Sequence, residues 1–236
     1  MADEQAIALI NGVPKLQRMG ADEPPREWLF TGADELFRGL YTRAGIGFAS
    51  EVLMVSSALA GEGKTTVSLG LALTVAQDYP ERRVVLVETD VQRPSLAGDF
   101  GVEPNPGLVD CVLGDDPIEA AFRPSFLDNL HIVPVGGPAR GHGRALRSSR
   151  MAALVDALRQ TYDLVVLDSP ALLVNSDSVM LSDLADGAIL VVRAGVTPAP
   201  TVAKAIEQID ESKLRGVVIN GSKSAIPGWL RRLGGM

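Results

Sequence analysis

The chain has very little cysteine and no excess of basic residues. One cysteine, Cys111, occurs among 236 residues, so no disulfide can form within the chain, and we expect this thiol to be a small core residue. The formal net charge is -7. Binding nucleic acid needs a clustered basic surface that neutralises phosphates, and we therefore expect no nucleic-acid partner.

Long apolar runs and zinc-ligand clusters are missing as well. No stretch approaches the roughly eighteen uncharged apolar residues that a membrane-spanning helix needs, and the first five residues lack the basic region that opens a secretory signal. The two histidines, His131 and His142, are separated and have no cysteine cluster beside them, which argues against zinc. We expect a cytoplasmic protein that reaches a membrane only through a partner.

What the sequence does contain is a series of apolar runs of strand length. They lie at residues 52–55, 84–87, 164–167, 189–192 and 217–219, with a weaker run around Ile132. Apolar residues at helical spacing fill several intervals, for example Met151, Leu154, Val155 and Leu158. Buried strands that alternate with helices predict an α/β fold with a doubly wound, mostly parallel sheet.

The segment after the first of these strands fits the Walker A pattern. It reads Ala58-Leu59-Ala60-Gly61-Glu62-Gly63-Lys64-Thr65, with alanine in place of the first glycine, and a helical pattern follows it. In such a loop the glycines let backbone N–H groups surround phosphate oxygens, the lysine reaches the β- and γ-phosphates, and the threonine hydroxyl ligates magnesium. We predict that ATP and Mg²⁺ bind at a P-loop made of Ala60, Gly61, Glu62, Gly63, Lys64, Thr65 and Thr66.

Acidic residues follow two more of the apolar runs. Glu88 and Asp90 come after the run at 84–87, and Asp168 follows the run at 164–167. The carboxyl ends of parallel strands form the edge at which α/β proteins bind ligands, so these carboxylates are expected beside the P-loop. The predicted catalytic residues are Lys64, Glu88, Asp90 and Asp168, and the predicted metal ligands are Thr65, Glu88, Asp90 and Asp168.

Composition divides the chain into three parts. Residues 1–33 mix glycine, proline and charge without lasting periodicity, which predicts an extended N-terminal arm. Residues 34–222 form the predicted P-loop ATPase domain, which opens with a short helix at 34–43. Residues 223–236 are predicted to be a flexible C-terminal tail.

Taken in order, these segments resemble the cytoplasmic ATPase domain of bacterial tyrosine kinases (BY-kinases), which regulate capsule and exopolysaccharide export together with a membrane chain-length partner. The resemblance spans roughly residues 34–222 and rests on the segments 56–66, 88–96 and 168–170. It implies phosphoryl transfer from ATP, as a protein-tyrosine kinase or an ATPase, and an adenine contact at Asn220. It also implies a membrane polysaccharide co-polymerase as partner and recruitment to the inner membrane, and it is compatible with a homo-oligomer.

Two departures from the BY-kinase pattern concern residues near the P-loop. The family has two aspartates where this chain has Glu88 and Asp90, and a displacement of about 1 Å at a reacting group can cost on the order of a hundredfold in rate. The oligomerisation motif of the family, Glu-x-x-Arg-x-x-Arg, is matched by Glu35 and Arg38 but is followed by Tyr41. These positions predict weak or altered catalysis and an altered ring contact.

A third departure concerns the phosphate acceptor. BY-kinases phosphorylate a tyrosine cluster in the C-terminal tail, whereas residues 221–236 contain no tyrosine. Autophosphorylation of that segment is therefore not expected. The tyrosines are Tyr41, Tyr79 and Tyr162, and the last two are expected to be structural because they lie at the ends of predicted elements.

Two other functions stay open at this point. The first is an ATP-gated binding module with little or no kinase activity, which the tyrosine-free tail and Glu88 favour. The second is a Par/Min-type positioning ATPase, which shares the predicted fold. Proteins of that type carry a signature lysine that would fall at position 59, where this chain has Leu59.

Overall fold

The computed structural model describes residues 7–10, 34–47, 49–114, 116–137 and 142–221. Its strands are β1 (Ile7–Ile10), β2 (Glu51–Ser57), β3 (Val84–Glu88), β4 (Arg123–Pro124), β5 (Leu130–Val133), β6 (Leu164–Asp168), β7 (Gly187–Arg193) and β8 (Leu214–Asn220). Its α-helices are α1 (Asp34–Arg43), α2 (Lys64–Asp78), α3 (Leu96–Phe100), α4 (Leu108–Leu113), α5 (His142–Leu146), α6 (Ser149–Thr161), α7 (Asp177–Leu184) and α8 (Ala199–Ile206). A short 3₁₀ turn, η1, spans Ile118–Ala121.

The strands form one sheet in the order β1-β8-β7-β2-β6-β3-β5-β4. Every neighbouring pair is parallel except β4 with β5. The carboxyl ends of the parallel strands therefore meet at one edge, and the register sets Val55 beside Asp168 and Asp168 beside Glu88. The predicted fold class, a doubly wound and mostly parallel α/β sheet, is confirmed.

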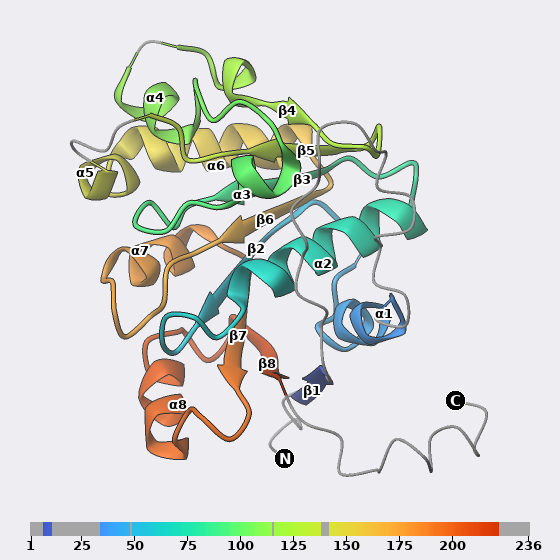
Figure 1. The fold of residues 1–236 in the computed structure, drawn as a ribbon, viewed down its shortest axis with the longest axis vertical. Coiled ribbons are helices and arrows are strands. Elements are labelled where there is room, and N and C mark those ends of the chain that lie inside the picture. Colours follow the sequence, from blue (N-terminus) through green and yellow to red (C-terminus); the bar gives the residue numbers. More distant parts are fainter. Residues whose placement is uncertain (1–6, 11–33, 48, 115, 138–141, 222–236) are drawn as a thin grey trace.

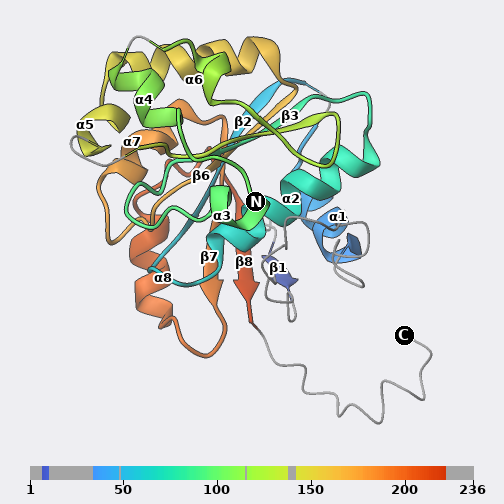
Figure 2. The same ribbon diagram turned by 45° about the horizontal axis from the view of Figure 1, so that its top comes forward.

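Helices cover both faces of the sheet, as a buried parallel sheet requires. In β2, Leu53 and Val55 belong to the core under α1 and α2, whereas Val52 and Met54 belong to the core under α4 to α8. This alternation follows from the period of two in a strand. Figures 1 and 2 show α2 crossing one face with α1 beside it and α6 lying on the other. The P-loop thus joins a fully sandwiched strand to a packed helix.

Helix α1 packs closely against α2, the helix that follows the P-loop. The Phe37 ring lies over Gly70, where an added Cβ would come within 2.1 Å of the ring. The Arg38 guanidinium donates two hydrogen bonds of 2.8 Å to the carboxylate of Asp78, and the Tyr41 hydroxyl donates a third, of 3.0 Å, to it. A glycine in the middle of α2 and an aspartate at its end therefore fix where α1 lies.

The part of the chain that was predicted to be an extended arm contributes a strand. Residues Ile7–Ile10 pair in parallel with β8, with Ile7 beside Val217 and Ile10 beside Asn220. The remaining described residues begin at Asp34, and the predicted tail at 223–236 lies outside the described residues. The domain boundaries accordingly stay predictions. Within the described ranges, none of the helices has the length and apolarity needed to cross a membrane.

Candidate nucleotide-binding site

The predicted P-loop leaves the carboxyl end of β2 and enters α2 at Lys64. Gly61 and Gly63 have φ angles of 82° and 95°, in the left-handed region where side chains are strained. At Gly63 an added Cβ would also lie 2.1 Å from Nδ2 of Asn220. Gly63 is therefore required both by the backbone turn and by the close approach of β8.

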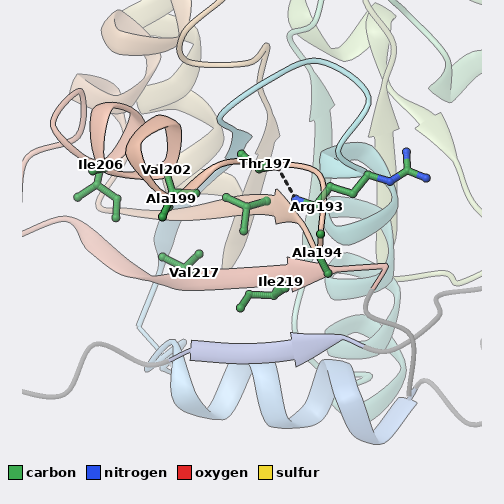
Figure 3. Close-up of a pocket in the computed structure, with 11 residues that line it drawn as sticks. Arg193, Ala194, Thr197, Ala199, Val202, Ile206, Val217 and Ile219 are labelled. Atoms are coloured by element: carbon green, nitrogen blue, oxygen red, sulfur yellow. Dashed lines mark hydrogen bonds between the residues drawn. The ribbon is translucent and has the colours of Figure 1, made fainter. Parts of the chain in front are cut away.

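Contacts from distant parts of the chain hold this loop in shape. The buried Glu62 carboxylate accepts a hydrogen bond of 2.6 Å from the Leu59 N–H and another from the Thr197 hydroxyl. The Asn220 side-chain amide donates to the Glu62 carbonyl at 2.9 Å. Figure 3 shows Thr197 beside Arg193 at the end of β7, where its hydroxyl accepts the Arg193 N–H at 3.0 Å. The Glu62 side chain thus shapes the loop.

Lys64 and Asp90 form an ion pair beside the loop. The Lys64 ammonium lies 2.6 Å from Oδ2 of Asp90, and the two side chains are 10% and 8% exposed. Asp90 occupies the turn after β3, and its other oxygen accepts the Gln92 N–H at 3.3 Å. The positive charge that a P-loop offers to phosphates therefore has an internal counter-ion here.

Asp168 ends β6 and is buried beside the start of α2. Its Oδ1 accepts a hydrogen bond of 3.1 Å from the Ser68 hydroxyl. Its Oδ2 is buried and has no hydrogen-bond partner. Burial raises the pKa of Asp168 to about 7, against the lowering effects of Lys64, Thr65 and Ser68. A buried carboxylate oxygen without a partner is well suited to meet a cation.

Glu88, which the sequence placed with the catalytic and metal-binding residues, turns its carboxylate toward backbone groups. Oε1 accepts the N–H groups of Ser95 and Leu96 at 2.5 and 2.9 Å, and Oε2 accepts the N–H of Val135 at 3.2 Å. The side chain is 1% exposed, and burial raises the pKa of Glu88 although the three backbone donors oppose that shift. Glu88 therefore lies beside Asp168 in the sheet, but its carboxylate is hydrogen-bonded to backbone N–H groups of other segments.

The other predicted residues line the loop at different depths. Ala60 and Gly61 are exposed, Thr65 and Thr66 are half-buried, and Asn220 is half-buried at the end of β8. The described residues include no group of three or more His, Cys, Asp or Glu side chains placed to hold a metal by themselves. Mg²⁺ in phosphate-binding sites is typically held by one or two carboxylates together with substrate phosphates and water, so the donor set still fits that ion.

Sequence reasoning missed several residues that support the site. Ser68 lies one helical turn after Lys64 and reaches Asp168, and Thr89 donates its N–H and its hydroxyl to the Asp168 carbonyl at 2.9 Å. Their spacing next to predicted site residues was a usable signal. Thr197 offered none, because its partner Glu62 is 135 residues away.

A comparison with known proteins places the chain in a family. No family model matches it. It is 32% identical over 188 residues to the tyrosine-protein kinase YwqD of Bacillus subtilis (strain 168), an alignment that covers 77% of this chain and 78% of YwqD.

The chain belongs to the bacterial tyrosine kinase family.

Other members of the bacterial tyrosine kinase family extend this result. The chain is 31% identical over 179 residues to the succinoglycan biosynthesis transport protein ExoP of Rhizobium meliloti (strain 1021), covering 74% of this chain but only 22% of ExoP. It superposes on the kinase domain of the Escherichia coli tyrosine kinase ETK with a TM-score of 0.81 and 23% identity, over 93% of this chain and 91% of that one. The latter likeness concerns the fold. The chain is therefore a BY-kinase-like P-loop domain related to proteins of exopolysaccharide biosynthesis.

In helix α1, the side chains at the positions compared with the oligomerisation motif of bacterial tyrosine kinases make contacts within this chain. Arg38 bonds to Asp78 of α2 and, at 2.9 Å, to Glu35 one turn earlier. Tyr41 donates to the same Asp78 carboxylate. These contacts tie α1 to α2, and the altered ring contact stays a prediction.

An apolar groove of about 520 Å³ lies near the site, between α8 and strands β7 and β8. Val202 and Ile206 of α8 face Val217 and Ile219 of β8 across it (Figure 3). None of the loop residues predicted to bind the nucleotide lines this groove. It is therefore separate from the phosphate-binding loop.

Proposed function

We propose that the chain binds ATP with Mg²⁺ at the P-loop and transfers the γ-phosphoryl group. The observation that carries this proposal is the buried Oδ2 of Asp168, which has no hydrogen-bond partner. This oxygen lies beside the start of α2, where the glycine turn leads to Lys64. Burying a polar oxygen without a hydrogen bond costs about 1–3 kcal/mol. A cation at this position would remove that cost.

The residues of the loop have separate tasks in this proposal. The N–H groups at the start of α2 and the turn at Gly61 and Gly63 bind phosphate oxygens. Lys64 neutralises phosphate charge and is held toward the site by Asp90. Bound Mg²⁺ would neutralise charge across the phosphates, and Thr65, Asp90 and Asp168 are the residues that would hold it. The adenine contact of Asn220 is part of the same proposal.

The acceptor hydroxyl is proposed to come from water or from another chain. Tyr162 is 5% exposed and packs edge-on against Phe122 and His131. The Tyr41 hydroxyl is bonded to Asp78. Tyr79 follows α2 at the end opposite the P-loop and packs edge-on against Tyr41. A partner protein is therefore the better source of a phosphorylated tyrosine.

The partner in this proposal is a membrane polysaccharide co-polymerase, with the chain cytoplasmic, recruited to the inner membrane and able to form a homo-oligomer. The kinship with ExoP, a transport protein of succinoglycan biosynthesis, supports it. A second candidate is an ATP-gated binding module with little phosphoryl transfer. The turned carboxylate of Glu88 favours that candidate, because one of the predicted catalytic acids faces backbone donors.

Turnover of purified protein with γ-labelled Mg-ATP tests the proposal. Released phosphate and phosphotyrosine are followed together, with and without the cytoplasmic segment of a chain-length partner, and Lys64→Met serves as the control. Phosphotyrosine on the partner supports a kinase, and phosphate without phosphotyrosine supports an ATPase. Tight binding without turnover supports the binding module, and no ATP binding by the wild-type protein overturns the proposal.

A further inference from the structure

Glu88, the last residue of β3, holds both ends of the segment that follows this strand. Residues 89–95 lead from Glu88 to the first turn of α3, and the carboxylate of Glu88 accepts the N–H groups of Ser95 and Leu96 at the far end. The first N–H groups of a helix have no partner within the helix. Glu88 provides these partners and so joins both ends of the segment.

The same carboxylate also reaches a third part of the chain. Its second oxygen accepts the N–H of Val135, which follows β5, the neighbour of β3 in the sheet. A carboxylate offers about four acceptor positions, and backbone donors use three of them here. Little capacity is left for a ligand at the P-loop.

The segment that Glu88 closes carries the counter-ion of the P-loop lysine. Asp90 lies two residues after Glu88, and its Oδ2 is 2.6 Å from the Lys64 ammonium. If the start of α3 moved away from β3, the turn that contains Asp90 would lose the hydrogen bonds at its far end. The ion pair of Lys64 thus involves a turn whose far end is held by a carboxylate that does not contact Lys64.

We propose that Glu88 is a positioning residue, which fixes the Asp90 segment and through it Lys64, and that Asp168 and Asp90 rather than Glu88 carry the chemistry with the nucleotide. This inference rests on the proposed function for its consequence in turnover, but its structural core concerns the protein without nucleotide. The length of the side chain is the reason for glutamate at this position. An aspartate is shorter by one carbon–carbon bond, about 1.5 Å, and cannot reach all three N–H groups.

Two substitutions at this position separate positioning from direct chemistry. Glu88→Gln keeps the length and an acceptor oxygen for Ser95 and Leu96, and loses the negative charge and the bond to Val135. Glu88→Asp keeps the charge and loses the reach. A positioning residue is therefore replaced better by glutamine, whereas a metal ligand or a base is replaced better by aspartate.

Steady-state kinetics with Mg-ATP supply one measurement. We expect Glu88→Gln to stay within about threefold of wild type, and Glu88→Asp to lose about tenfold or more in kcat/KM with a higher KM, because a displaced segment misplaces Lys64. An active Glu88→Asp with an inactive Glu88→Gln, and a loss confined to kcat, would overturn the inference.

Amide hydrogen exchange without nucleotide or metal supplies the second measurement. We expect slow exchange at Ser95 and Leu96 in the wild type and in Glu88→Gln, and exchange at least about tenfold faster in Glu88→Asp. The matched control is Asp186→Asn, which removes a carboxylate that accepts the Val52 N–H at 2.8 Å and should leave both amides unchanged. Wild-type exchange at the rate of an unstructured peptide would overturn the inference even if neither variant folds. This measurement remains decisive if the protein binds no ATP, so the failure of the proposed function is recognised separately.

Discussion

The Lys64 ammonium and the Asp90 carboxylate form an ion pair of 2.6 Å from which water is almost excluded. Removing one partner of such a pair leaves an uncompensated charge, which typically costs about 3–5 kcal/mol. The phosphate-binding lysine is therefore also a structural residue in the protein without nucleotide. Its substitution is expected to change stability as well as binding.

Lys64→Met is expected to abolish ATP binding and to lower the free energy of unfolding by about 3 kcal/mol, because Asp90 stays buried and charged. Urea unfolding and ATP titration measure the two effects. The double variant Lys64→Met/Asp90→Asn should regain most of the stability and none of the binding. Unchanged ATP affinity in Lys64→Met would refute the site assignment, and equal stability of the single and double variants would refute the burial argument.

The raised pKa of Asp168 predicts a pH-dependent stability. Its pKa in the folded protein is about 7, against an ordinary value of 3.8, so the folded state keeps the proton longer than the unfolded state. The stabilising contribution is complete below about pH 4 and is lost as pH rises toward 7. Asp168→Asn cannot ionise, and at pH 8 without Mg²⁺ it should be more stable than wild type by about 4 kcal/mol.

Thermal unfolding at pH 5 and pH 8 tests this prediction. The advantage of Asp168→Asn should be clearly smaller at pH 5 than at pH 8, and Mg²⁺ with nucleotide should stabilise only the wild type. An advantage that is equal at both pH values would show that packing rather than ionisation is responsible.

The two P-loop glycines should differ in their tolerance of a methyl group. In Gly61→Ala no atom lies within 4 Å of the added Cβ. The cost is therefore only that of the left-handed φ, about 1–2 kcal/mol. Gly63→Ala meets the same strain and also the Asn220 amide at 2.1 Å. We expect Gly63→Ala to lose more stability and at least about tenfold more ATP affinity. Fluorescent-nucleotide titration compares them, and equal losses would contradict the placement of β8.

The contact between α1 and α2 should weaken in acid. The hydrogen bonds from Arg38 hold the pKa of Asp78 below its ordinary value, so this stabilisation is present above about pH 4 and is lost as pH falls below it. Asp78→Asn should lower the melting temperature at pH 7, and it should lower it less near pH 3. Glu35→Gln is the control, because the Glu35 side chain is 83% exposed; a larger effect of Glu35→Gln would refute the assignment.

Sequence patterns were sufficient for the central strands and for the P-loop. Fully buried strands such as β3 and β6 are continuous apolar runs, and the glycines, lysine and threonine of the loop have fixed spacing because phosphate geometry dictates it. The parallel register then brought Asp168 beside the loop. These features depend on local sequence and on general rules of α/β folds.

Other features depend on partners that no local pattern reveals. The direction of the Glu88 side chain follows from N–H groups at Ser95 and Val135, and the role of Glu62 follows from Thr197. Strand β1 is four residues long and pairs, among the described residues, with β8 alone, so its short run carried too little signal among prolines and charges. In each case tertiary contacts decide between conformations that the sequence leaves equally open.

Glu62 accepts hydrogen bonds from Leu59 and Thr197 at its carboxylate and from Asn220 at its carbonyl, and these bonds have a thermodynamic consequence. A loop that is already fixed by its own chain loses its conformational entropy on folding, and little further ordering is required when a ligand arrives. Each immobilised side chain would otherwise cost about 0.5–1.5 kcal/mol on association. The heat and entropy of binding should therefore reflect displaced water and neutralised charge, with only a small contribution from ordering of the loop.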